Sequence, residues 1–104
     1  MSDREIILSR IKQTVHSVAP DATVILYGSY ARGEENEESD IDLLILVNEE
    51  VNDSDTVKIQ YPLFDLGFET GNLISPMVHF SQIWEKKYAG TPFYESVMQD
   101  AVYL

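Results

Sequence analysis

Two pairs of residues in the first half of the chain have the types and the spacing that phosphate and metal chemistry requires. Gly28 and Ser29 follow an apolar run, and Asp40 and Asp42 come ten residues later, where a second apolar run begins. A glycine and a serine that leave a buried strand allow a sharp turn and a close backbone approach. Their N–H groups and the Ser29 hydroxyl would then point at an anion. We expect a phosphate to bind there.

The two aspartates complement such a phosphate site. Asp40 and Asp42 have the period-two spacing of a strand, so both carboxylates project from the same face. Two carboxylates this close raise the pKa of one of them unless a cation lies between them, and Mg²⁺ prefers such oxygen ligands. Phosphoryl transfer mainly requires a metal and backbone donors that hold the phosphates. The two pairs therefore predict one phosphate and metal site; the alternative is a tight turn followed by a solvated acidic loop.

The elements that must position these residues follow from hydrophobic periodicity and capping. Apolar residues at helical spacing and a Ser2–Glu5 capping box predict a helix over residues 3–18. Three apolar runs rich in β-branched residues predict strands over residues 23–28, 41–47 and 73–80. Pro76 places the third strand at an edge or a bulge. Between the first two strands we expect one helical turn over 30–33 and an exposed loop over 34–39.

The stretch over residues 53–71 fits two structures. As a helix it would be capped by Asp53 or Ser54 and ended by Gly71. Its apolar face would then carry Val57, Tyr61, Phe64 and Phe68. Alternation of apolar residues also fits a strand, and Pro62 weakens a helix at its middle. We prefer the helix.

The last quarter of the chain predicts two more helices. Ser81 is expected to cap a short helix over 81–87, and Thr91 with Pro92 at the first helical position begins a helix that ends near Ala101. The whole pattern predicts a single α/β (α+β) domain over residues 1–104. Its core would be a small mixed β-sheet of three to four strands flanked by helices.

Composition narrows the class of protein further. The 104 residues carry a net charge of −11, and the seven basic residues are scattered, so long nucleic acid is not expected as a substrate. The chain has no cysteine, which excludes thiol chemistry and zinc–thiolate sites. There is no apolar run long enough for a membrane span or a signal peptide. We expect a cytoplasmic protein that binds a nucleotide with the help of a metal, or a basic protein partner.

The stretch YGSYARGEENEESDIDLLILV, residues 27–47, resembles the signature of the minimal nucleotidyltransferases, a branch of the DNA polymerase beta superfamily. The resemblance implies a polymerase-beta-like nucleotidyltransferase fold. It implies that Gly28 and Ser29 hold the triphosphate of ATP, and that Asp40 and Asp42 bind up to two Mg²⁺ ions. For Arg32 it leaves two roles open, support of the loop or contact with phosphate.

The resemblance also implies a third carboxylate on a later strand, which completes the metal site and helps to deprotonate the attacking hydroxyl. Here that strand offers Ser75 instead. The candidate substitute is Glu69, which would reach the site if the Phe64/Phe68 face of the preceding segment packs inward.

Members of this family often act beside a HEPN-domain toxin. The resemblance therefore implies an antitoxin that transfers AMP from ATP to a hydroxyl of its protein partner. The alternative is a degenerate nucleotidyltransferase that neutralises its partner by binding alone, which the missing third carboxylate favours. Because the chain is short, either the partner or a second copy in a homo-oligomer would have to supply further binding surface.

Overall fold

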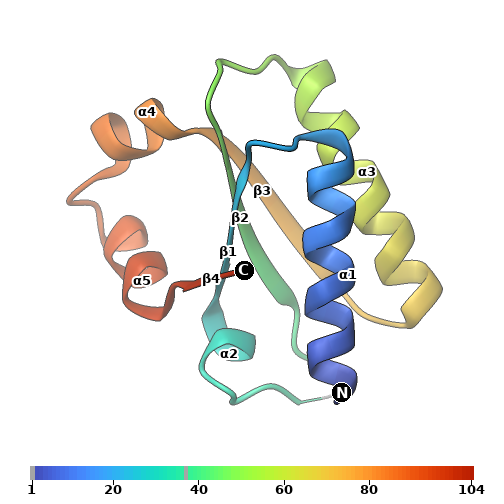
Figure 1. The fold of residues 1–104 in the computed structure, drawn as a ribbon. Helices are drawn as coiled ribbons and strands as arrows, with labels where there is room; N and C mark the ends of the chain where they lie inside the picture. The colour runs from blue at the N-terminus through green and yellow to red at the C-terminus, as the bar shows by residue number, and fades with distance from the viewer. Residues whose placement is uncertain (1, 37) are drawn as a thin grey trace.

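A four-stranded mixed sheet separates two groups of helices in the computed structural model, which describes residues 2–36 and 38–104 (Figure 1). In chain order the elements are α1 (Asp3–Val18), β1 (Thr23–Tyr27), α2 (Gly28–Ala31), β2 (Ile41–Val47), α3 (Asp53–Thr70), β3 (Ile74–Phe80), α4 (Ser81–Ile83), the π-helical turn η1 (Trp84–Tyr88), α5 (Pro92–Asp100) and β4 (Val102–Tyr103). The predicted fold class, a mixed sheet flanked by helices, is confirmed.

The strands run in the order β3-β2-β1-β4. β1 is antiparallel to both β2 and β4, whereas β2 and β3 are parallel. Pro76 therefore lies in an edge strand, as predicted, where the missing N–H costs no ladder hydrogen bond on the open side. β4 was not predicted, because two exposed residues carry no readable alternation.

Helices α1 and α3 cover one face of the sheet, and α4, η1 and α5 lie against the other (Figure 1). The first core joins buried residues of α1 and α3, such as Ile11 and Leu63, to strand residues that include Leu26 and Leu43. The second core is smaller and gathers Ile25, Leu44, Trp84 and Val97. Successive strand residues belong alternately to the two cores, as a sheet covered on both faces requires.

The segment that fitted either a helix or a strand is helical throughout, including Pro62. Its helix is capped by Asn52, whose side chain accepts from the Asp55 N–H in a capping box, and not by Asp53 or Ser54 as expected. Gly71 ends it in the left-handed conformation at φ 73°. Strong caps and a buried face outweigh the backbone bond that Pro62 removes.

The face of α3 that packs inward is not the predicted one. Ile59, Leu63 and Leu66 are buried against α1 and the sheet. The predicted stripe is exposed instead, with Phe68 at 92%. The helix carries apolar residues on two faces, and periodicity alone does not say which face meets the sheet.

Two smaller expectations changed, and two were met. Ser81 makes no capping hydrogen bond, because the helix follows β3 directly and its N-cap is Phe80. The last helix begins as predicted, at Pro92, with the Thr91 hydroxyl accepting from the Tyr94 N–H at 3.2 Å. The first helical turn begins at Gly28 rather than at residue 30. The connection before β2 is irregular, as expected, and Glu37, which was assigned to it, lies outside the described residues.

Candidate nucleotide and metal site

Gly28 lies directly against Asp42, so the two halves of the motif meet in space. Its φ of +77° is a conformation that favours glycine. A Cβ at this position would lie 2.6 Å from Asp42 Oδ2, closer than two such atoms approach. Tyr27, the residue before Gly28, is paired with Asp42 across the antiparallel strands β1 and β2. Glycine is therefore required at position 28 by both backbone conformation and space.

Both aspartates face the same side of the sheet. Asp42 and Leu44 are two residues apart on β2, so Asp42 lies on the face that carries the Trp84 core. Parallel pairing of β2 with β3 brings Ser75 next to Asp42. The Ser75 hydroxyl donates to Asp40 Oδ2 at 3.3 Å, which places all three side chains together. The residue that stands where a third carboxylate was expected does lie beside the two aspartates.

The surroundings of this group disfavour negative charge. Burial, and next the negative charge of Asp40, raise the pKa of the Asp42 carboxyl above its usual range. Burial and the charge of Asp42 likewise raise the pKa of the neighbouring Tyr27 hydroxyl. Both effects mean that negative charge is costly at this place.

The residues present fit a hard divalent ion. Mg²⁺ is commonly held by one or two carboxylates, with waters and substrate phosphates completing its six ligands. Asp40 and Asp42 would supply that pair, and the Ser75 hydroxyl would add a neutral oxygen. Within residues 2–36 and 38–104, no group of three or more acidic or histidine side chains is arranged to hold a metal. A metal bound here would therefore have two carboxylate ligands from the described part of the chain.

Ser29 lies in the first turn of α2 and remains available to a ligand. Its carbonyl accepts from the Glu34 N–H at 3.0 Å, while its hydroxyl makes no hydrogen bond to the rest of the described chain. The side chain is half-buried, close to the Gly28 backbone. A free hydroxyl beside a glycine turn is suited to donate to a phosphate oxygen.

Arg32 ties the end of this turn to a distant helix. Its Nε donates to Glu34 at 3.0 Å, and its Nη1 donates to Asp100 at the end of α5 at 2.6 Å. Of the two roles left open for Arg32, these contacts favour support of the loop.

Glu69 is not brought to Asp40 and Asp42. It lies at the end of α3, which packs on the sheet face opposite to Asp42. There it accepts a hydrogen bond from Arg10 of α1 at 3.1 Å, and its side chain is 65% exposed. The expectation that this residue reaches the site depended on an inward Phe64/Phe68 face, and that face is exposed.

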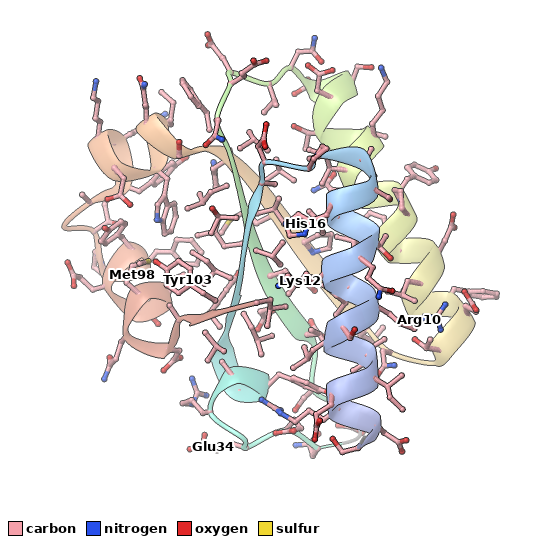
Figure 2. All side chains as sticks on the ribbon, viewed as in Figure 1. Arg10, Lys12, His16, Glu34, Met98 and Tyr103 are labelled. Atoms are coloured by element: carbon pink, nitrogen blue, oxygen red, sulfur yellow. The ribbon has the colours of Figure 1, made fainter. Side chains whose placement is uncertain are left out.

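Two residues that the sequence did not single out hold the loop before Asp40. Arg4 in the first turn of α1 pairs with Glu35 at 2.6 Å, and its guanidinium lies 4.8 Å from the centre of the Tyr30 ring. Glu35 was expected in a solvated loop, yet its side chain is only 25% exposed. These residues are 31 positions apart, and nothing local marks either as paired. Figure 2 shows the neighbouring Glu34 on this loop, below α2.

Two surface hollows lie away from this site. One, of about 330 Å³, is lined by the first turns of α1, including Arg10, by Thr70 at the end of α3 and by Asn72 in the loop that follows. The other, of about 360 Å³, lies near Pro20 and Val51 at the opposite end of β2 from Asp42. The carboxylate group itself is open to solvent, with Asp40 exposed and Asp42 half-buried.

Comparison with known proteins identifies the family. A family model for the nucleotidyltransferase domain matches residues 8–104. The chain belongs to this nucleotidyltransferase family. A relative from Methanocaldococcus jannaschii, named "Putative protein adenylyltransferase", is 36% identical over 93 residues, which is 88% of each chain. The resemblance found in the motif is therefore confirmed.

Solved structures share the fold of this nucleotidyltransferase domain. One, described as a "putative minimal nucleotidyltransferase", superimposes with a TM-score of 0.67 at 24% identity and covers 99% of this chain and 97% of its own. Another belongs to the complex of a tri-AMPylated HEPN toxin with an MNT antitoxin from Shewanella oneidensis. It superimposes with a TM-score of 0.63 at 14% identity over 96% of this chain and 70% of that one. At these identities the likeness establishes the fold. None of the described helices of the domain is both long and apolar enough to cross a membrane.

Proposed function

We propose that this nucleotidyltransferase domain transfers AMP from ATP to a hydroxyl group of a protein partner in a Mg²⁺-dependent reaction. The observation that carries the proposal is the contact between Gly28 and the Asp42 carboxylate, with Asp40 on the same face of the sheet. It joins a backbone turn suited to phosphate with the pair of carboxylates suited to a metal. The 36% identical relative named as a protein adenylyltransferase supports the choice of AMP and of a protein acceptor.

The roles of the residues follow from their positions. Asp40 and Asp42 would hold one or two Mg²⁺ ions, which when bound neutralise charge on the triphosphate. The Gly28 backbone and the Ser29 hydroxyl would orient the phosphates. Arg32, with Asp100, and Arg4, with Glu35, hold the two sides of the loop that connects these groups. They are positioning residues.

In the proposed reaction the partner's hydroxyl oxygen bonds to the α-phosphorus of ATP. The bond from that phosphorus to the oxygen that bridges to the β-phosphate breaks, and pyrophosphate leaves. The hydroxyl proton passes to solvent, because no third carboxylate lies beside Asp40 and Asp42 in the described chain. Without a positioned base, we expect a slow transfer, since such a base contributes on the order of 10²–10⁴-fold.

For the partner we propose a HEPN-domain toxin, which this domain would neutralise as the antitoxin. The support is the similar fold in the complex of an AMPylated HEPN toxin with an MNT antitoxin. A net charge of −11 also suits association with a basic protein surface.

The test uses the protein, ATP labelled at the α-phosphate, Mg²⁺ and the purified product of the adjacent gene. We expect label to move to the partner and pyrophosphate to be released. Loss of an outer-sphere residue of a metal site costs about 10–100-fold, so loss of a direct ligand in Asp42→Asn should lower transfer at least ~100-fold. Glu49→Gln, which removes an exposed carboxylate from the far end of β2, serves as the matched control and should transfer normally. Undiminished transfer by Asp42→Asn would refute the assignment.

A second candidate function is neutralisation by binding without turnover, and Ser75 beside Asp42 favours it. In that case the wild-type protein transfers no label, and the double variant Asp40→Ala/Asp42→Ala still protects against the toxin. Loss of protection in the double variant, with partner binding intact, would exclude this candidate.

A further inference from the structure

An exposed apolar stripe runs along the outer face of α3. It consists of Val57, Tyr61, Phe64 and Phe68, and we call it the α3 stripe. The exposed fractions of these side chains are 44%, 63%, 48% and 92%. α3 lies at the outer side of the molecule, beside α1 (Figure 1). Four large apolar side chains aligned on one helix face are typical of an interaction surface rather than of scattered surface residues.

The spacing of the stripe is that of a helix-pairing seam. Its members are separated by four, three and four residues, which is the alternation of core positions in a heptad. The opposite side of the helix, with Ile59, Leu63 and Leu66, is already buried in the domain. The stripe is therefore a second seam on one helix, and it fits another helix lying alongside.

We propose that the α3 stripe pairs with the same stripe of a second copy of this chain, with the two α3 helices antiparallel about a twofold axis between Pro62 and Leu63. In this arrangement Val57 of one copy packs on Phe68 of the other, and Tyr61 packs on Phe64. A twofold contact requires a surface that complements itself, and a small residue facing a large one at each end meets that requirement.

The charges beside the stripe complement each other in this arrangement. Lys58 is the one basic residue of α3, and in the antiparallel pair it lies beside Asp65 of the other copy, twice by symmetry. Both side chains are exposed, and neither takes part in an ion pair within the described part of the chain.

Like charges stay apart in the same register. The acidic residues of α3 are Asp53, Asp55, Asp65 and Glu69. At the same level along the pair, the other copy presents an uncharged residue to each of them, and these are Asn72 (just beyond the end of α3), Thr70, Gln60 and Thr56 respectively. For a protein with a net charge of −11, a face on which no two acids oppose each other is what allows self-association.

The pairing leaves the candidate nucleotide site open. α3 covers the sheet face opposite to Asp42, so both sites of a dimer would face outward. The inference is thus independent of the proposed function, and its failure would leave that function untouched.

Sedimentation equilibrium of the full chain tests the pairing. We expect a concentration-dependent dimer, and Phe68→Ser, which removes an exposed ring, should raise its dissociation constant at least ~10-fold. Tyr103→Ser removes an aromatic side chain from β4 that is 62% exposed and should leave the constant unchanged. A protein that stays monomeric up to about 1 mM, or a dimer that is insensitive to Phe68→Ser, would overturn the proposal.

A charge reversal tests the antiparallel register. Lys58→Asp places two acids together at each of two symmetric positions and should weaken the dimer about 10-fold. The double variant Lys58→Asp/Asp65→Lys restores both pairs and should return the constant to within about threefold of wild type. If Lys58→Asp strengthens association, or if the double variant stays as weak as the single one, the register is wrong. If only the adjacent gene product binds the stripe, the occupant is a different protein and self-pairing is refuted.

Discussion

Replacing Ser75 by aspartate should convert the two-carboxylate site into a three-carboxylate site. Ser75 is paired with Asp42 across parallel strands, whose separation is about 5 Å, and its hydroxyl lies 3.3 Å from Asp40 Oδ2. An aspartate there points to the same face as the other two. The matched control is Ser75→Asn, which has the same shape and no charge.

The size of the effect follows from the separation of the charges. Two unit charges at about 5 Å interact by about 1 kcal/mol in a water-like medium and by about 3 kcal/mol at an effective dielectric constant of 20. Because Asp40 is exposed and Asp42 is half-buried, the lower end applies. Without metal, Ser75→Asp should be about 1 kcal/mol less stable than Ser75→Asn at pH 7. The deficit should shrink as the pH falls and the carboxyl whose pKa is raised takes up a proton.

With Mg²⁺ present the sign reverses, because the added charge attracts the ion. An extra attraction of about 1–2 kcal/mol corresponds to roughly tenfold tighter binding. Thermal unfolding at increasing Mg²⁺ measures this, since a ligand stabilises the folded protein according to its free concentration over its dissociation constant. AMP transfer to the partner should rise in the same variant. If Ser75→Asp responds to Mg²⁺ no more strongly than Ser75→Asn, then position 75 does not face the metal and the reasoning fails.

Three further substitutions test other parts of the structure. Gly28→Ala places a methyl group on a left-handed backbone and against the Asp42 carboxylate. It should destabilise the protein by about 1–3 kcal/mol in denaturant unfolding and abolish the Mg²⁺ response. A stable variant with a normal response would contradict this geometry. Asp42→Asn should stabilise the metal-free protein at pH 7, because a carboxyl whose pKa is raised in the folded state costs stability above that pKa. The gain in stability should disappear as the pH falls through this pKa. A gain that persists in acid would have another cause. Trp84→Ala empties the centre of the second core, where the indole is fully buried and its Nε1 has no hydrogen-bond partner among the described residues. This change should cost about 3–5 kcal/mol in urea unfolding, and a cost below about 1 kcal/mol would mean that this layer is loosely packed.

The second core contacts the end of β1, next to the candidate site. Trp84 is surrounded by the rings of His79, Tyr88, Phe93 and Tyr94 at centroid distances of 5.1–6.0 Å. Burial, and next the charge of Lys87, lower the pKa of His79, which favours the neutral ring in this aromatic layer. Phe93 also meets Tyr27, the residue before Gly28, edge-on at 6.4 Å. The aromatic layer therefore holds the end of β1, and with it the glycine turn, in place.

Local sequence determined the elements that carry the motif. Caps and apolar periodicity predicted α1 and the start of α5, and β-branched runs ended by glycine or opened by aspartate predicted β1 and β2. The juxtaposition of Gly28 with Asp42 was also predictable, because the two strands are adjacent in the chain and a short loop returns one beside the other. These features depend on interactions within a few residues or across one connection.

Tertiary structure alone decided the rest. Ser75 donates a hydrogen bond to Asp40, 35 positions away in the sequence, and Arg32 donates one to Asp100, 68 positions away. Local sequence patterns therefore predict neither contact. α3 has two apolar faces, and only packing against α1 and the sheet shows that Leu63 is inside and Phe68 outside. Because the Leu63 face of α3 is buried, Glu69 lies on the sheet face opposite to Asp42 and the α3 stripe is exposed. A sequence states which residues can be buried, whereas the assembled layers decide which of them are, because burial on one helix face excludes burial on the other.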